Sequence, residues 1–347
     1  MFKIADKFEI TDDKFHYTCG YYTTNKWIGN DKLVIVRSTE QSIGNGNPKK
    51  GDILELVLYT ISTGKIKVLT NDMKSFEDYV VYGNYVYYSN GKQIIRLNVD
   101  TLEKEIIFEC DIDLWSPHIT YDGKFISTYA LDGEKTRIYR INTETKTGEL
   151  VYKKSFAPPF WESDHAMTNP KDHNIIFYAH EGTTFYISNR LWLHDVEKNT
   201  DRNIAKQKLN EKGELGDCFG HEMWAPDGKG LYFVKYDCSP EHPNGICYVD
   251  AESGEHKLLF TGHKFWHVGV SQDGKYLLSD TQSDIFKSEV YVIDVNTGEE
   301  LLAGVADTDW VHPCHPHPQM SPDDKRVIYT SLNEKGRTVV NIVNLTN

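Results

Sequence analysis

Residues 225–229 read Ala-Pro-Asp-Gly-Lys and lead directly into the apolar run Gly230–Val234. Proline and aspartate favour a tight turn, and glycine accepts the positive φ angle that such a turn requires. The same signature recurs along the chain at intervals of about 40 to 56 residues, which indicates an internal repeat. The other copies are clear at 121–124, 271–275 and 321–325, looser at 169–174, and weak at 29–32 and 82–84.

A second pattern alternates with these turns. It is a strand of alternating apolar residues that ends in Asp or Asn before a polar turn, and it occurs at 56–64, 93–98, 137–142, 190–195, 245–250, 289–294 and 338–344. Each repeat of roughly 50 residues therefore contains four short strands, as in a propeller blade. The predicted fold is all-β, a seven-bladed β-propeller with four antiparallel strands per blade and a single domain over residues 1–347. Residues 2–10 are expected to complete the last blade.

The chain is acidic, with 51 Asp and Glu against 38 Lys and Arg and a formal net charge of −13. This balance argues against nucleic acid or an anionic membrane as partner, although a local cation cluster or metal can still bind an anionic small molecule. The first residues show no signal peptide, and no apolar run approaches the ~18 residues of a membrane span. We therefore expect a cytoplasmic protein with reduced cysteines. The sequence carries no signal for an oligomeric state.

Histidines occupy one equivalent position in four successive repeats. The position lies four residues before the tight turn, on the strand that would line the channel of a propeller. It holds Ser116 in the third repeat and then His165, His221, His267 and His317. A lone histidine there would most often be a hydrogen-bonded core residue. Four of the 14 histidines at one register position favour a shared functional site instead.

The seventh repeat adds a run of histidines and prolines, His312-Pro-Cys-His-Pro-His-Pro318. Residues before proline are extended, so His315 and His317 point to the same side of the strand. A bend at Pro313 lets His312 reach them. Imidazole nitrogens from this run and from the neighbouring His267 suit a divalent transition metal. The sequence therefore predicts a metal site at His267, His312, His315 and His317.

Several of these motifs resemble the oligogalacturonate lyase family of polysaccharide lyases, which are seven-bladed β-propellers. The resemblance covers residues 160–330 well, and residues 1–150 only in their blade pattern. Its motifs are 165–172, 177–182, 190–192, 221–228, 266–268 and the run 312–317. The resemblance implies a manganese site of three histidines and one glutamine. The histidines map onto His267, His315 and His317, while the glutamine falls on His312, which implies either an all-histidine site with altered metal preference or a gap in the match.

The resemblance also implies that His221 is the Brønsted base and that Arg190 assists it. From the sequence alone Arg190 would be a surface arginine at the start of an ordinary strand. His180 and Glu181 follow a strand at a loop, a common place for substrate contacts, although a local turn interaction would explain them equally. Together with His165, these two residues are predicted to bind substrate.

The predicted reaction is β-elimination of an oligogalacturonide. A neutral histidine takes the C5 proton, a metal and an arginine stabilise the developing charge, and a 4,5-unsaturated uronate forms. Three alternatives stay open: a non-catalytic propeller of the TolB or WD40-like kind, a lyase for another uronide, and a hydrolase on the same fold. A propeller that gates a peptidase is disfavoured, because the sequence has no Gly-x-Ser-x-Gly motif.

Overall fold

The structure is a computed structural model that describes residues 2–41, 51–283 and 285–346. Every secondary structure element of these residues is a β-strand, which confirms the all-β class. They contain no helix that is long and apolar enough to cross a membrane. Two compact units are present, one of Met1–Asn90, Ile95–Glu105 and Gly269–Asn347 and one of Gly91–Ile94 and Ile106–Val268. That the units act as one domain, and that the protein is cytoplasmic, stay predictions.

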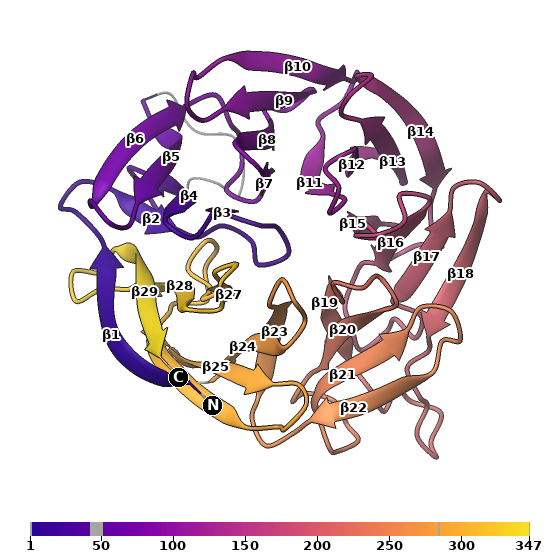
Figure 1. Cartoon of the computed structure of the whole chain (residues 1–347). Coiled ribbons are helices and arrows are strands. Elements are labelled where there is room, and N and C mark those ends of the chain that lie inside the picture. Colours follow the sequence, from indigo (N-terminus) through magenta and orange to yellow (C-terminus); the bar gives the residue numbers. More distant parts are fainter. Residues whose placement is uncertain (1, 42–50, 284, 347) are drawn as a thin grey trace. The chain divides into compact units, whose positions relative to one another are not determined.

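The strands form antiparallel sheets that follow the sequence repeats (Figure 1). The first sheet contains β2 (His16–Thr18), β3 (Trp27–Ile28), β4 (Lys32–Ser38), β5 (Leu54–Thr60) and β6 (Lys65–Thr70), and the second contains β7 (Tyr79–Tyr82), β8 (Tyr85–Ser89), β9 (Gln93–Asn98) and β10 (Lys104–Glu109). The third contains β11 (Trp115–Ile119), β12 (Phe125–Asp132), β13 (Lys135–Asn142) and β14 (Thr147–Lys154), and the fourth contains β15 (Ser163–Thr168), β16 (Ile175–His180), β17 (Leu191–Asp195) and β18 (Thr200–Ala205). The fifth contains β19 (Phe219–Trp224), β20 (Gly230–Lys235), β21 (Gly245–Asp250) and β22 (His256–Phe260).

The remaining strands form one larger sheet of two groups, which meet at the pair Asp307–Leu332. One group contains β23 (Phe265–Val270), β24 (Tyr276–Thr281), β25 (Lys287–Asp294) and β26 (Glu300–Asp307), and the other contains β27 (Gln319–Met320), β28 (Arg326–Leu332), β29 (Thr338–Thr346) and β1 (Lys3–Ile10). The described residues thus form six sheets, the largest of which divides into two groups, and the count of seven blades stays a prediction. β1 pairs with β29 from Lys3–Thr346 to Ile10–Val340, so the N-terminal strand completes the last group as predicted (Figure 1).

The two sequence signatures have fixed places in these groups. In six of the groups the tight turn joins the first and second strands, and the alternating pattern is the third strand. In the first sheet, which has five strands instead of the predicted four, the turn joins β3 and β4 and the pattern lies on β5. At the turn that follows β19, Gly228 has a φ of 73° and its N–H donates to the carbonyl oxygen of Ala225 at 2.9 Å. The conformation needs a residue that accepts positive φ, which is why glycine stands there.

A shared apolar core fixes the fourth and fifth sheets against each other. Phe177 and Leu193 of the fourth sheet pack in one buried cluster with Phe219, Phe233 and Val249 of the fifth. Full burial of each such side chain contributes about 1.5–3 kcal/mol. The core holds the first strands of these sheets, β15 and β19, and these strands carry His165 and His221.

Candidate active site

The equivalent histidine positions coincide with irregularities in the first strands. The register of strand pairing shifts between Asp164 and Met167 in β15 and between Gly220 and Met223 in β19. His165 and His221 lie within these shifts and have φ angles of 51° and 55°. β-Bulges redirect side chains, and positive φ costs a residue other than glycine about 1–3 kcal/mol. The placement of these two imidazoles therefore costs conformational free energy.

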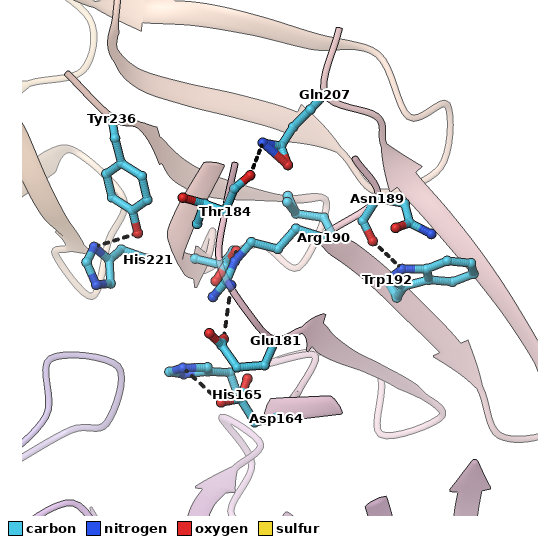
Figure 2. Close-up of polar contacts among 12 residues, drawn as sticks. Asp164, His165, Glu181, Thr184, Asn189, Arg190, Trp192, Gln207, His221 and Tyr236 are labelled. Carbon is cyan, nitrogen blue, oxygen red and sulfur yellow. Dashed lines mark hydrogen bonds and ion pairs between the residues drawn. The ribbon is translucent and has the colours of Figure 1, made fainter. Parts of the chain in front are cut away.

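His221 is held in one tautomer. Its Nδ1 bonds to the carbonyl oxygen of Trp266, which can only accept, so Nδ1 carries the proton and Nε2 keeps its lone pair. The hydroxyl oxygen of Tyr236 lies 3.0 Å from the same Nδ1 (Figure 2). Burial, followed by the nearby His267 and Arg190, lowers the pKa of His221 well below its usual range. The ring is therefore neutral at neutral pH, with Nε2 ready to accept a proton.

Arg190 is buried, with only 5% of its surface exposed. Its Nε donates to Glu222 Oε1 at 2.6 Å and its Nη1 donates to Glu181 Oε2 at 2.9 Å (Figure 2). Burial alone would lower the pKa of Arg190, but Glu222 and Glu181 raise it well above the usual range, so the guanidinium stays charged. The expectation of a surface arginine, drawn from the sequence alone, is therefore wrong.

Asp164, His165 and Glu181 form a compact cluster next to Arg190. One carboxylate oxygen or imidazole nitrogen from each residue lies within 4.8 Å of the corresponding atoms of the other two. Nε2 of His165 is 3.6 Å from Asp164 Oδ2 (Figure 2). Burial and the neighbouring Glu181 raise the pKa of Asp164 well above its usual range, whereas burial lowers the pKa of His165. Two residues predicted to bind substrate, His165 and Glu181, thus lie together beside the predicted catalytic arginine.

His180 is engaged in a separate set of contacts. Its Nε2 donates to the carbonyl oxygen of Phe160 at 2.8 Å, and its Nδ1 is 3.2 Å from Oδ1 of Asn189. The ring stacks on Phe156, with 3.6 Å between ring centroids. These contacts favour a role in positioning the loop after β16, and a substrate contact by His180 stays a prediction.

The three histidines of the run in the seventh repeat also lie close together. The ring centroid of His315 lies 3.9 Å from that of His312 and 5.5 Å from that of His317. Nδ1 of His317 donates to the carbonyl oxygen of Gly20 at 3.1 Å, which leaves Nε2 as its ligand atom. The backbone N–H of His317 donates to the buried carboxylate of Asp280 at 3.2 Å. An imidazole oriented by a carbonyl is the usual arrangement in metal sites, so these residues suit a divalent metal.

His267 lies on β23, the strand in which the chain passes from the second unit into the first. It is buried, and its ring centroid is 4.1 Å from that of His221. The predicted base and one predicted metal ligand are thus neighbours within the second unit.

Four contributors were not predicted from the sequence. Glu222 and Tyr236 contact Arg190 and His221, and Asp164 and Asp280 contact His165 and His317. Glu222 could have been found from the sequence, because it is an acidic residue that directly follows the predicted base His221. Tyr236 follows β20 directly, and Asp280 is the last residue but one of β24. The sequence does not show which first strand either residue faces.

Gly220 makes room for the hydroxyl group of Tyr236, and this gives a prediction. A Cβ atom at Gly220 would lie 1.9 Å from Tyr236 Oη. Gly220→Ala is expected to displace Tyr236 from His221, lowering kcat about 2- to 10-fold and costing about 1–3 kcal/mol of stability. Initial rates and urea unfolding measure the two effects.

Gly304→Ala is the matched control for that variant. Its Cβ would lie 2.1 Å from Tyr329 Oη, a similar clash among residues outside the candidate site. It should cost similar stability and leave kcat unchanged. Equal losses of kcat in both variants would mean that the contact of Tyr236 with His221 has no part in catalysis.

Comparisons with known proteins identify relatives of this chain. The sequence model of the oligogalacturonate lyase family matches residues 52–347. The oligogalacturonate lyase of Dickeya dadantii (strain 3937) is 26% identical over 280 residues, which are 76% of this chain and 66% of that protein. The oligogalacturonide lyase of Pectobacterium atrosepticum is 25% identical over 286 residues, 71% of this chain and 70% of that protein. The chain thus spans just under two thirds of the length of the Dickeya protein.

A solved structure, an oligogalacturonate lyase in complex with manganese, superposes with a TM-score of 0.81 at 18% identity. The match covers 100% of this chain and 96% of that chain, and it confirms the predicted β-propeller fold class. The family match itself includes both the Arg190–His221 site and the histidine run of the seventh repeat. This chain therefore belongs to the oligogalacturonate lyase family.

Proposed function

We propose that the protein is an oligogalacturonate lyase that cleaves oligogalacturonides by β-elimination and leaves a 4,5-unsaturated uronate end. The observation that carries the proposal is the tautomer of His221, whose Nδ1 is committed to the Trp266 carbonyl oxygen. Such a ring presents an unprotonated Nε2 at neutral pH, as abstraction of the C5 proton requires. Family membership supports the choice of substrate class.

The site residues of the second unit have separate roles in this proposal. His221 takes the C5 proton at Nε2, while Trp266 and Tyr236 hold its ring in place. Arg190 has five N–H donors, and Glu181 and Glu222 engage one each. The remaining donors are available to the uronate carboxylate, where negative charge develops as the proton leaves. The carboxylates of Glu181 and Glu222 keep the guanidinium from moving.

We propose that His267, His312, His315 and His317 bind a divalent metal, manganese by analogy with the solved relative. When bound, such an ion supplies Lewis-acid charge that makes the C5 proton more acidic. Support comes from the donor set itself, because His317 is oriented by Gly20 and the rings of His312 and His315 adjoin it.

Removal of one proposed ligand tests the metal site. His317→Ala is expected to weaken manganese binding by at least about 10- to 100-fold, the range found even for partners of ligands. Titration of free Mn²⁺ by electron paramagnetic resonance measures the affinity without reference to activity. His242→Ala, at an exposed histidine, is the control and should bind as the parent does. Unchanged affinity in His317→Ala would remove this residue from the site.

The lyase activity itself is tested by ultraviolet absorbance with digalacturonate and trigalacturonate. We expect absorbance from the conjugated double bond to rise with added Mn²⁺ and to stop rising with a chelator. No rise from a protein that still binds Mn²⁺ would redirect the proposal to another uronide. No rise together with no metal binding would favour a non-catalytic propeller of the TolB kind.

A further inference from the structure

The proposed elimination moves two protons, and the residues described so far account for one of them. His221 accepts the proton from C5. The glycosidic oxygen that leaves C4 must gain a proton, because an unprotonated hemiacetal oxygen is a poor leaving group. In a galacturonide the C5 proton and the C4 oxygen lie on opposite faces of the ring. The acid must therefore approach from the side opposite the base.

His165 is the candidate for this acid. It holds the position on β15 that His221 holds on β19, with nearly the same φ angle. In Figure 2 the His165 ring lies next to the carboxylate of Glu181, and the His221 ring lies to the left of the Arg190 guanidinium. Both imidazoles thus lie near Arg190, the group proposed to bind the uronate carboxylate.

Asp164 lies behind His165 and is more enclosed. The side chain of Asp164 is 13% exposed and that of His165 is 29% exposed. Oδ2 of Asp164 faces Nε2 of His165 at 3.6 Å, slightly longer than a hydrogen bond. The second oxygen of Asp164, Oδ1, is buried without a hydrogen-bond partner. The imidazole nitrogen Nε2 of His165 is therefore the basic group next to the carboxyl group of Asp164.

The charges around Asp164 favour a protonated carboxyl group. Glu181, Glu162 and Glu222 surround it, and Arg190 is the cation that opposes them. Arg190 is already paired with two of these carboxylates at 2.6 and 2.9 Å. A further buried negative charge would be unbalanced, and carboxyl groups in that position retain a proton. The raised pKa of Asp164 agrees with this count of charges.

Resting on the proposed function, we propose that Asp164 and His165 together are the general acid of the elimination. Nδ1–H of His165 gives its proton to the glycosidic oxygen as the C4–O bond breaks and the C4=C5 double bond forms. Nε2 of His165 takes the proton of the Asp164 carboxyl group in the same step. Asp164 ends as a carboxylate and His221 ends protonated, so charge and protons balance, and solvent exchange restores both groups.

Hydrogen exchange at C5 separates proton abstraction from departure of the leaving group. Manganese-loaded Asp164→Asn is incubated with digalacturonate in D₂O, and proton NMR follows both the loss of the H5 signal and the formation of unsaturated product. Elimination should fall about 10²- to 10⁴-fold, as expected when a general acid is removed. Exchange at C5 should continue, because His221 is intact. The unreacted substrate should therefore accumulate deuterium, whereas with the parent protein we expect elimination to consume the substrate before deuterium accumulates.

His165→Asn should give the same signature, and Asp195→Asn, which alters an exposed ion pair with Lys198, should behave as the parent does. Unchanged elimination in Asp164→Asn and His165→Asn would overturn the proposal. Loss of exchange and elimination to the same extent would also overturn it, because both residues would then only maintain the site. If the parent protein neither exchanges nor eliminates, the proposed function fails, and this result is distinct from either outcome.

Discussion

His221→Ala is expected to lower kcat of oligogalacturonate elimination by about 10²- to 10⁴-fold, the usual contribution of a general base. The loss should fall on kcat, because the ring contributes a proton acceptor and little binding surface. Initial rates by ultraviolet absorbance at saturating Mn²⁺ measure it. Because the ring lies 4.1 Å from that of His267, the Mn²⁺ affinity of the variant must be measured as well, and we expect it to be unchanged.

Tyr236→Phe is a milder variant to compare with His221→Ala. It removes the hydroxyl group 3.0 Å from Nδ1 but leaves the Trp266 carbonyl oxygen, which suffices to keep the proton on Nδ1. The loss of one hydrogen bond should lower kcat no more than about 10-fold. If His221→Ala retained more than about a tenth of the parent kcat, another group would be the base.

The repeats and the register of the first strands could be predicted from the sequence. A tight turn fixes the pairing of the strands on either side of it, so counting back from the turn reaches equivalent positions in every repeat. Ser116, His165, His221 and His317 confirm this count, because all four have φ angles between 44° and 55°. His267 is not among the described residues with positive φ, although it occupies the same position in the sequence.

The environment of Arg190 could not be predicted in this way. Its two carboxylate partners come from different places in the chain, Glu181 from the loop after β16 and Glu222 from β19. Neither lies at a spacing along the sequence that marks an ion pair. Pairing of β16 with β17 places Glu181 near Arg190, as the backbone bond from His180 N–H to the Arg190 carbonyl oxygen at 2.8 Å shows, and the packing of the fourth sheet on the fifth adds Glu222. The same reason applies to Asp164, whose pKa is raised by burial and by the carboxylates of Glu181, Glu162 and Glu222, which come from three places in the chain.

Arg190→Met is expected both to destabilise the protein and to abolish elimination. The substitution leaves Glu222, which is 2% exposed, as a buried carboxylate without its cation. Breaking a buried pair by removing one partner costs about 3–5 kcal/mol, which urea unfolding would detect. Activity would be lost in any case, so this variant alone does not separate support of the fold from stabilisation of developing charge.

The triple variant Arg190→Met, Glu181→Gln, Glu222→Gln makes that separation. It removes the two carboxylates along with the cation, so no uncompensated charge stays buried, and most of the lost stability should return. Elimination should stay lost, because nothing then neutralises the uronate carboxylate as the C5 proton leaves. If activity returned with stability, Arg190 would serve only to balance Glu181 and Glu222. If only stability returned, Arg190 and its two partners would be needed for the reaction and not only for the stability of the fold.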